Sequence, residues 1–230
     1  CVPSKALIRS ARVLAQFKHT PNFNIQVSGA TVDFAAVMDR VQRVISTIAP
    51  HDSVERYTAL GVDVALGRAR IATPWQVDIT GADGQVRSLR TRAIVIAAGA
   101  RPFMPPIPGI DLVDPLTSDT IWQLRQRPER LLVLGGGPIG CELSQAFARL
   151  GCQVTQVEMA ERLLLREDAE VSAAVAQGLQ ADGVQLKLGH KAQRFVREAD
   201  VDGGGKCLLA EHQGQVVRVG FDVLLVAVGR

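Results

Sequence analysis

The chain has 230 residues, which is enough for one large domain or two of ordinary size, and its 47% hydrophobic content suits a globular core. A formal net charge of +3, without any basic run, argues against a nucleic-acid partner, and no apolar stretch reaches the roughly 18 residues of a membrane span. The four cysteines form no C-x-x-C pair and the four histidines lack ligand spacing, so no metal site or disulfide framework is indicated.

Helical patterns open the chain. A first helix should begin at Pro3 or Ser4, and its apolar residues recur on one face: Leu7, Ala11 and Leu14. A second helix should follow a cap at Thr31 or Asp33. Its amphipathic stripe alternates spacings of three and four, at Phe34, Val37, Val41, Val44 and Ile48. Pro50 should kink or stop this second helix.

The pattern then changes to short strands. They are expected at residues 62–66, 70–71, 75–80 and 86–89, the last two forming a hairpin around the turn 81–84. Residues 93–98 are entirely apolar and predict a central strand buried on both faces. The proline-rich residues 101–108 read as a linker, and Thr117 or Ser118 should cap a helix that runs to Leu124.

A strand, a glycine turn, a helix and a second strand follow one another from residue 131 to residue 157. Gly135, Gly137 and Gly140 satisfy the pattern G-x-G-x-x-G between the first strand and the helix. In such a βαβ unit the first glycine permits a tight turn, the second lets the backbone approach a pyrophosphate, and the third lets the helix pack against the strand. The N-terminus of the helix offers N–H groups and partial positive charge to that pyrophosphate. The segment therefore predicts dinucleotide binding.

An acid ends the second strand of this unit. Glu158 stands where a carboxylate can accept hydrogen bonds from the ribose hydroxyls of the adenosine. A 2′-phosphate placed there would be repelled, and no arginine directly follows the strand. The sequence therefore favours NAD over NADP.

The last part of the chain alternates again between helix and strand. A helix capped near Asp168 should point Val171, Val175 and Leu179 inward, and residues 184–188 should add a third parallel strand. A meander is expected at residues 195–199, 207–212 and 215–219 around the loop 202–205, followed by a buried strand at 221–228. The predicted fold class is α/β, a Rossmann-like NAD-binding domain with a parallel sheet and a β-meander.

Four short stretches resemble signatures of the flavin-dependent pyridine nucleotide–disulfide oxidoreductases. Residues 1–5, CVPSK, resemble the second half of the redox motif C-x-x-x-x-C-V-P-S-K. The others, at family spacing, are AAGARP at 97–102, GGGPIGCE at 135–142 and VAVGR at 226–230. The resemblance covers the whole chain, and mercuric reductases and dihydrolipoamide dehydrogenases look nearest. Residues 5–9 and 163–168 lean toward the mercuric reductases, whereas Glu158 leans toward the NADH-using dehydrogenases.

The resemblance implies FAD and NAD as cofactors and a relay of electrons from the nicotinamide through the flavin to a disulfide. It implies Cys1 as the sulfur nearest the flavin, Lys5 as the cation beside the flavin ring, and Glu142 as the partner of Lys5 near the hydride path. Ala98, where threonine is commoner, and Gly99 would pass the FAD. The residues implied around NAD are Gly135, Gly137, Pro138, Ile139, Gly140, Glu158 and Gly229.

Three parts of the family pattern are expected but not found. They are a first redox cysteine five residues before Cys1, a FAD-binding glycine turn further upstream, and a C-terminal interface domain with a His–Glu pair and dimer contacts. The resemblance therefore implies an interior fragment: part of a split FAD-binding domain over residues 1–116 and an NAD-binding domain over residues 117–230. The longer protein would be a cytoplasmic, homodimeric enzyme acting on a small molecule or a dithiol. The fragment itself should be inactive.

Two alternatives stay open. Within the oxidoreductase hypothesis, mercuric ion and lipoamide-type substrates are not separated by these residues. A nucleotide-binding or redox-sensing module that never used a disulfide is the hypothesis from another class.

Overall fold

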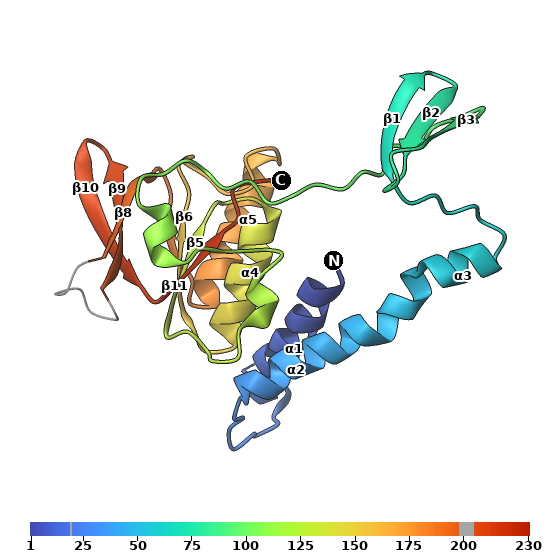
Figure 1. Ribbon diagram of the computed structural model, residues 1–230. Coiled ribbons are helices and arrows are strands. Elements are labelled where there is room, and N and C mark those ends of the chain that lie inside the picture. The colour runs from blue at the N-terminus through green and yellow to red at the C-terminus, as the bar shows by residue number, and fades with distance from the viewer. Residues whose placement is uncertain (19, 198–204) are drawn as a thin grey trace. The chain divides into compact units, whose positions relative to one another are not determined.

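The computed structural model describes residues 1–18, 20–197 and 205–230 and divides the chain into two compact units (Figure 1). The first unit combines Cys1–Ile45 with Arg101–Arg230, and the second is Ser46–Ala100. No helix in these described ranges has both the length and the apolar character that crossing a membrane requires. The expected domains, 1–116 and 117–230, stay a prediction.

A five-stranded parallel sheet forms the centre of the first unit. Its order is β4 (Leu116–Thr117), β11 (Val223–Val226), β5 (Arg130–Leu134), β6 (Gln153–Val157) and β7 (Gln185–Lys187). A separate antiparallel meander has the order β10 (Gln215–Phe221), β9 (Lys206–His212) and β8 (Lys191–Arg197). The predicted α/β class, with a parallel sheet and a meander, is confirmed.

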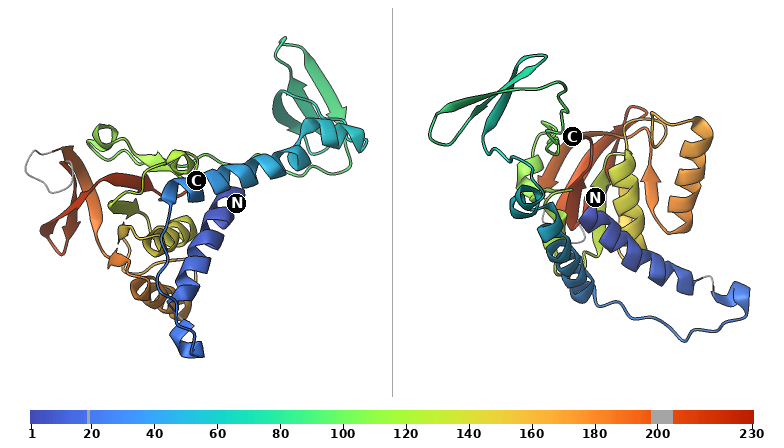
Figure 2. Two further views of the ribbon diagram at one scale, coloured as in Figure 1. Left: turned by 90° about the horizontal axis from the view of Figure 1, so that it is seen from below. Right: turned by 90° about the vertical axis from the view of Figure 1, so that its right-hand side faces the viewer.

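The sheet is covered on both faces. In β5, Leu131 and Val133 pack into one core, whereas Leu132 and Leu134 pack into a second core. The first core lies between the sheet and the helices α4 (Pro138–Arg149) and α5 (Ala169–Ala181), and the second core lies between the sheet and the meander. The two helices and the meander cover opposite faces of the sheet (Figures 1 and 2). Burial on both faces explains why the strand reads as an uninterrupted apolar run.

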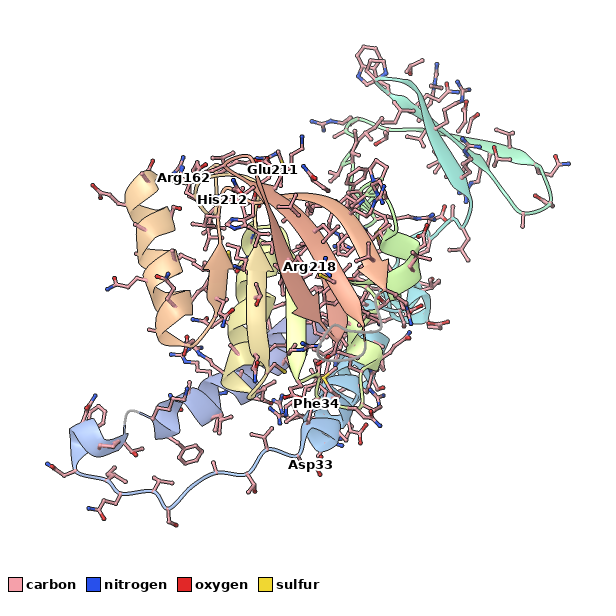
Figure 3. The ribbon with its side chains drawn as sticks, turned by 90° about the vertical axis from the view of Figure 1, so that its left-hand side faces the viewer. Asp33, Phe34, Arg162, Glu211, His212 and Arg218 are labelled. Atoms are coloured by element: carbon pink, nitrogen blue, oxygen red, sulfur yellow. The ribbon has the colours of Figure 1, made fainter. Side chains whose placement is uncertain are left out.

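Two helices from the start of the chain complete the first core. Helix α1 (Val2–Phe17) packs against α4, and α2 (Phe34–Ile48) buries Phe34, whose ring lies 6.2 Å from that of Phe147. Asp33 caps α2, since its Oδ1 accepts a hydrogen bond of 3.0 Å from the Ala36 N–H (Figure 3). The guanidinium of Arg40 donates to the Ala6 carbonyl at 2.8 Å and links the two helices. Both predicted helices are confirmed, with Asp33 rather than Thr31 as the cap.

Short helical turns join these elements. The 3₁₀ turns are η1 (Thr20–Phe23), η2 (Ala49–Asp52), η3 (Ile110–Val113) and η4 (Ile121–Gln123). The turn η2 contains Pro50 and ends α2 as predicted. The turn η3 buries Ile110 and Val113 in the second core.

The second unit contains a short helix and a small sheet. Helix α3 (Val54–Ala59) precedes an antiparallel sheet of β1 (Arg68–Thr73), β2 (Gln76–Thr80) and β3 (Val86–Arg90). The predicted hairpin of β2 and β3 is confirmed. Residues 46–100 are all described, and none of them is buried.

Two predicted strands in the second unit are wrong. Residues 62–66 and 93–98 form no strand, and Val95 and Ile96 are 88% and 76% exposed. A strand exists only through hydrogen bonds to neighbours, and none of the described strands pairs with either segment. The apolar composition of residues 93–98 therefore indicated a preference for burial, but it did not predict whether the segment forms a strand or is buried.

Three details of the first unit also differ from prediction. The helix expected after Thr117 is the single turn η4, because Leu116 and Thr117 pair with β11. In α5, Val171 is 46% exposed, and Ser172 occupies the inward position one residue later. The buried strand expected at 221–228 is divided between the end of β10 and β11. Of the meander, the predicted strand positions 198–199 and the loop 202–204 lie outside the described residues.

Candidate functional site

The three glycines of the motif, Gly135 and Gly137 between β5 and α4 and Gly140 inside α4, each have a distinct geometry. Gly135 adopts φ +114°, and a Cβ there would lie 2.5 Å from the Ala227 carbonyl oxygen. At Gly137, the N-cap of α4, a Cβ would meet nothing within 4 Å. At Gly140 a Cβ would press directly on the Gly135 carbonyl oxygen. The motif is thus closed at Gly135 and Gly140 and open at Gly137, which stands between them, where a ligand can approach the backbone.

The open middle of the turn is also the N-terminus of a helix. Pro138 occupies the first turn of α4, where its missing N–H costs nothing. The Ile139 amide belongs to the same turn, whose N–H groups have no intrahelical partner. These groups and the positive end of the helix dipole favour an anion such as a pyrophosphate. The geometry fits the predicted dinucleotide.

Glu158 lies beside the turn, directly after β6. Its Oε2 accepts a hydrogen bond of 2.6 Å from the Gly136 N–H, and its Oε1 accepts one of 2.8 Å from the Ala160 N–H. A carboxylate has about four lone-pair sites, so two acceptor positions remain for ribose hydroxyls. The carboxylate is therefore held in place and can still accept the hydrogen bonds from ribose hydroxyls that the sequence analysis predicted.

The arginine nearest to Glu158 in the following loop is already engaged. The guanidinium of Arg162 donates to the carbonyls of Glu167 at 2.8 Å and Leu165 at 3.0 Å, and it stands at one edge of the unit (Figure 3). These bonds fold the loop back on itself. Arg162 is thus a loop-forming residue, and in this arrangement its guanidinium is committed to the backbone.

Lys5 and Glu142 meet although 137 positions separate them in sequence. The Lys5 Nζ lies 2.8 Å from both carboxylate oxygens of Glu142, with the first turn of α1 facing the first turn of α4. The predicted approach of these two side chains is confirmed. Beside them lies a pocket of about 220 Å³, whose lining residues are Lys5, Ile8, Ala11, Glu142, Gln145, Ala146 and Arg149.

The Lys5–Glu142 pair should contribute little to stability, since the two side chains are 57% and 43% exposed. Replacing Lys5 by Met or Glu142 by Gln is expected to change the free energy of unfolding by less than about 1 kcal/mol. Urea unfolding of the two single variants and the double variant measures this coupling. A coupling energy of several kcal/mol would contradict a solvated pair and indicate a structural ion pair.

The four cysteines are all free, and only Cys1 is exposed. Burial raises the pKa of the Cys152 thiol to about 12. Burial, and more weakly the negative charge of Glu158, also raises the pKa of Cys141. Raised pKa values leave these two thiols protonated and unreactive at neutral pH. Cys1 is therefore the cysteine available for thiol chemistry.

The remaining predicted site residues are Gly229, Ala98 and Gly99. Gly229 adopts φ +139° near the end of the first unit, and its carbonyl accepts a hydrogen bond of 2.9 Å from the Phe103 N–H. Ala98 and Gly99 belong to the second unit and have no regular secondary structure. The first unit brings together the glycine turn, Glu158, Lys5 and Glu142. The functions of all these residues stay predictions.

Sequence reasoning missed Gln156, a residue of β6 that is fully buried under the glycine turn. A signal was available, because Gln156 is a polar residue in a strand that is otherwise apolar where it faces α4.

The described ranges contain no group of three or more His, Cys, Asp or Glu side chains arranged so that it could hold a metal ion.

Comparisons with known proteins agree on one family. A family model described as pyridine nucleotide-disulphide oxidoreductase matches residues 1–230. Mercuric reductase of Lysinibacillus sphaericus is 32% identical over 230 residues, which cover 100% of this chain and 40% of that protein. Dihydrolipoyl dehydrogenase of Bacillus subtilis is 30% identical over 239 residues, covering 100% of this chain and 50% of that protein.

A solved structure shows the same architecture. The Cu(II) complex of the HOCl-induced flavoprotein disulfide reductase RclA from Escherichia coli matches with a TM-score of 0.71 and 25% identity, over 100% of this chain and 46% of that one. The chain thus spans half or less of the length of each of these relatives.

Proposed function

Because the chain belongs to the pyridine nucleotide-disulphide oxidoreductase family, we propose that the whole protein uses FAD and NADH to reduce a disulfide or a metal ion. The observation that carries the proposal is the contact between Lys5 and Glu142. It joins the helix that begins after Cys1 to the helix that begins at the glycine turn. Residues expected near the two cofactors are thereby held at one place.

In this proposal, different residues of the chain bind different parts of the two cofactors. The open backbone at Gly137 and the amide of Ile139 bind the pyrophosphate, and Glu158 binds the adenosine ribose. Ala98 and Gly99 would help to hold the FAD, and Gly229 would help to hold the nicotinamide half of the NADH. Bound FAD and NADH supply the hydride transfer, which the protein must shield and orient.

Charge decides the proposed function of Lys5, and exposure decides that of Cys1. The ammonium of Lys5 would stabilise negative charge on the ring system beside it, and Glu142 fixes the direction of that ammonium through two bonds of 2.8 Å. Cys1 is exposed and lies at the N-terminus of α1. Cys1 is thus the sulfur proposed to accept electrons. In the whole protein, proposed to be a homodimer, a second sulfur completes the disulfide.

Replacing Cys1 by Ser in the full-length protein tests the proposal. The variant is expected to lose disulfide-dependent oxidation of NADH by at least about a hundredfold, because an alcohol cannot replace the redox sulfur. Anaerobic NADH should still bleach the flavin absorbance of the variant. Cys207→Ser is the matched control, since Cys207 is buried in the meander and should leave turnover unchanged. Full turnover in the Cys1 variant, or wild-type protein without flavin absorbance, would contradict the proposal.

A further inference from the structure

Gln156 is a buried polar side chain whose position needs an explanation. It is the penultimate residue of β6, is 0% exposed, and shares its face of the strand with Val154, which packs into the core under α4. The neighbouring Val157 packs into the other core. An apolar residue would satisfy this position for folding alone.

The amide of Gln156 contacts the glycine turn from below. Its Nε2 donates a hydrogen bond of 2.9 Å to the carbonyl oxygen of Gly135 and lies 3.7 Å from the Sγ of Cys141. A Cβ added at Gly140 would lie 3.1 Å from the same nitrogen. The amide group therefore fills the space between the end of β5, the turn and the first turn of α4.

The same side chain leaves one polar atom without a partner. The Oε1 of Gln156 is buried and accepts no hydrogen bond. An unsatisfied buried acceptor destabilises the folded state. The hydrogen bond to Gly135 is thus made at a cost in stability, which points to a use other than folding.

The turn is also held from its side by Glu158, through the hydrogen bond from the Gly136 N–H. The Gln156 amide fixes the Gly135 carbonyl, and the Glu158 carboxylate fixes the next amide. The two bonds hold opposite ends of one peptide group, the one between Gly135 and Gly136, and Gly137 is left with its backbone open. Rotation of this peptide group would turn the backbone that faces the open side.

We propose that Gln156 is a positioning residue for dinucleotide binding, which holds the glycine turn in its binding geometry through the Gly135 carbonyl. The inference rests on the proposed function, because it takes the open side of the turn as the pyrophosphate site. Gln156 does not touch the nucleotide and acts only through the turn.

Gln156→Met tests the inference in the full-length protein, because methionine keeps the length of the side chain without its hydrogen bond. The variant is expected to bind NADH roughly five- to tenfold more weakly, as the loss of one hydrogen bond allows. Its unfolding midpoint should stay within a few degrees of wild type, because loss of the bond and removal of the unsatisfied oxygen oppose each other. Fluorescence titration and thermal unfolding measure the two quantities.

Ser144→Ala is the matched control. The Oγ of Ser144 on α4 is also fully buried and without a partner, and it makes no hydrogen bond to the turn. This variant should keep wild-type NADH affinity and unfold at the same or a higher temperature. If Gln156→Met binds NADH as wild type does, or loses affinity only in proportion to lost folded protein, the inference is overturned. Absence of NADH binding by wild type would instead overturn the proposed function.

Gln156→Glu adds a second measurement, the pH dependence of NAD⁺ binding, which should not change if Gln156 is only a structural residue. An ionised carboxylate would face the Gly135 carbonyl oxygen and repel it, whereas a protonated one can donate the missing hydrogen bond. The dissociation constant for NAD⁺ of this variant should therefore fall as the pH is lowered from 8 toward 5.5, relative to wild type. A ratio of the two constants that does not change with pH would contradict the positioning role.

Discussion

The full-length protein is expected to bind NADH roughly ten- to a hundred-fold more tightly than NADPH, which is the effect of one hydrogen bond to a charged group. Glu158 is held by the Gly136 and Ala160 amides, and its remaining lone pairs can accept bonds from the ribose hydroxyls. A 2′-phosphate would replace an attractive contact by repulsion between two anions. The guanidinium of Arg162 is committed to two backbone carbonyls in this structure.

Glu158→Gln should reduce the preference for NADH over NADPH, because it should weaken the binding of NADH and strengthen the binding of NADPH. The neutral amide weakens the hydrogen bonds to the ribose of NADH and removes the repulsion of a 2′-phosphate. Glu161→Gln is the control, since Glu161 is an exposed carboxylate in the same loop and should leave both affinities unchanged. Titration with NADH and NADPH measures the ratio. Equal or tighter binding of NADPH by wild type would refute the assignment of Glu158.

Gly140→Ala is expected to weaken dinucleotide binding at least about tenfold and to destabilise the fold by about 1–3 kcal/mol, the usual result of overpacking. The added Cβ would press on the Gly135 carbonyl oxygen, which is backbone and cannot swing away as a side chain can. Either α4 moves from the sheet or the glycine turn changes shape. Both movements disturb the amides that face the open middle of the turn.

Gly178→Ala in α5 is the matched control for that substitution. It also replaces a helical glycine, but a Cβ at Gly178 would meet nothing within 4 Å. Alanine should therefore stabilise the protein by roughly 0.5–1 kcal/mol, because glycine is the poorer helix former. Denaturant unfolding and NADH titration of both variants distinguish close packing from helix propensity. Unchanged binding and stability in the Gly140 variant would show that the third glycine is not required.

The local elements around the site were predictable because their signals are contained in short stretches of sequence. The apolar run of β5, the glycine turn and the periodicity of α4 each specify their own conformation, and the structure confirms them. The contact between Lys5 and Glu142 is different. Nothing in either stretch indicates the other, and only the resemblance to a known family predicted that they meet.

The parts of the fold that were not predicted depend on contacts between segments that are distant in sequence. Residues 93–98 have the composition of a buried strand, but composition does not supply the neighbours that a strand requires. For Gln156, the sequence shows the residue but not the contact that the residue makes. Gln156 was not predicted as a functional residue, because its partner, the Gly135 carbonyl, is brought to it only by folding.

The absence of buried side chains in residues 46–100 has a thermodynamic consequence. The heat capacity change of unfolding arises from the hydration of apolar surface that folding had removed from water. A segment whose side chains are all partly or fully exposed adds less to that quantity, and less to the denaturant sensitivity that scales with newly exposed area. Most of the heat capacity change of unfolding of these 230 residues is therefore expected to come from the two cores on either side of the parallel sheet.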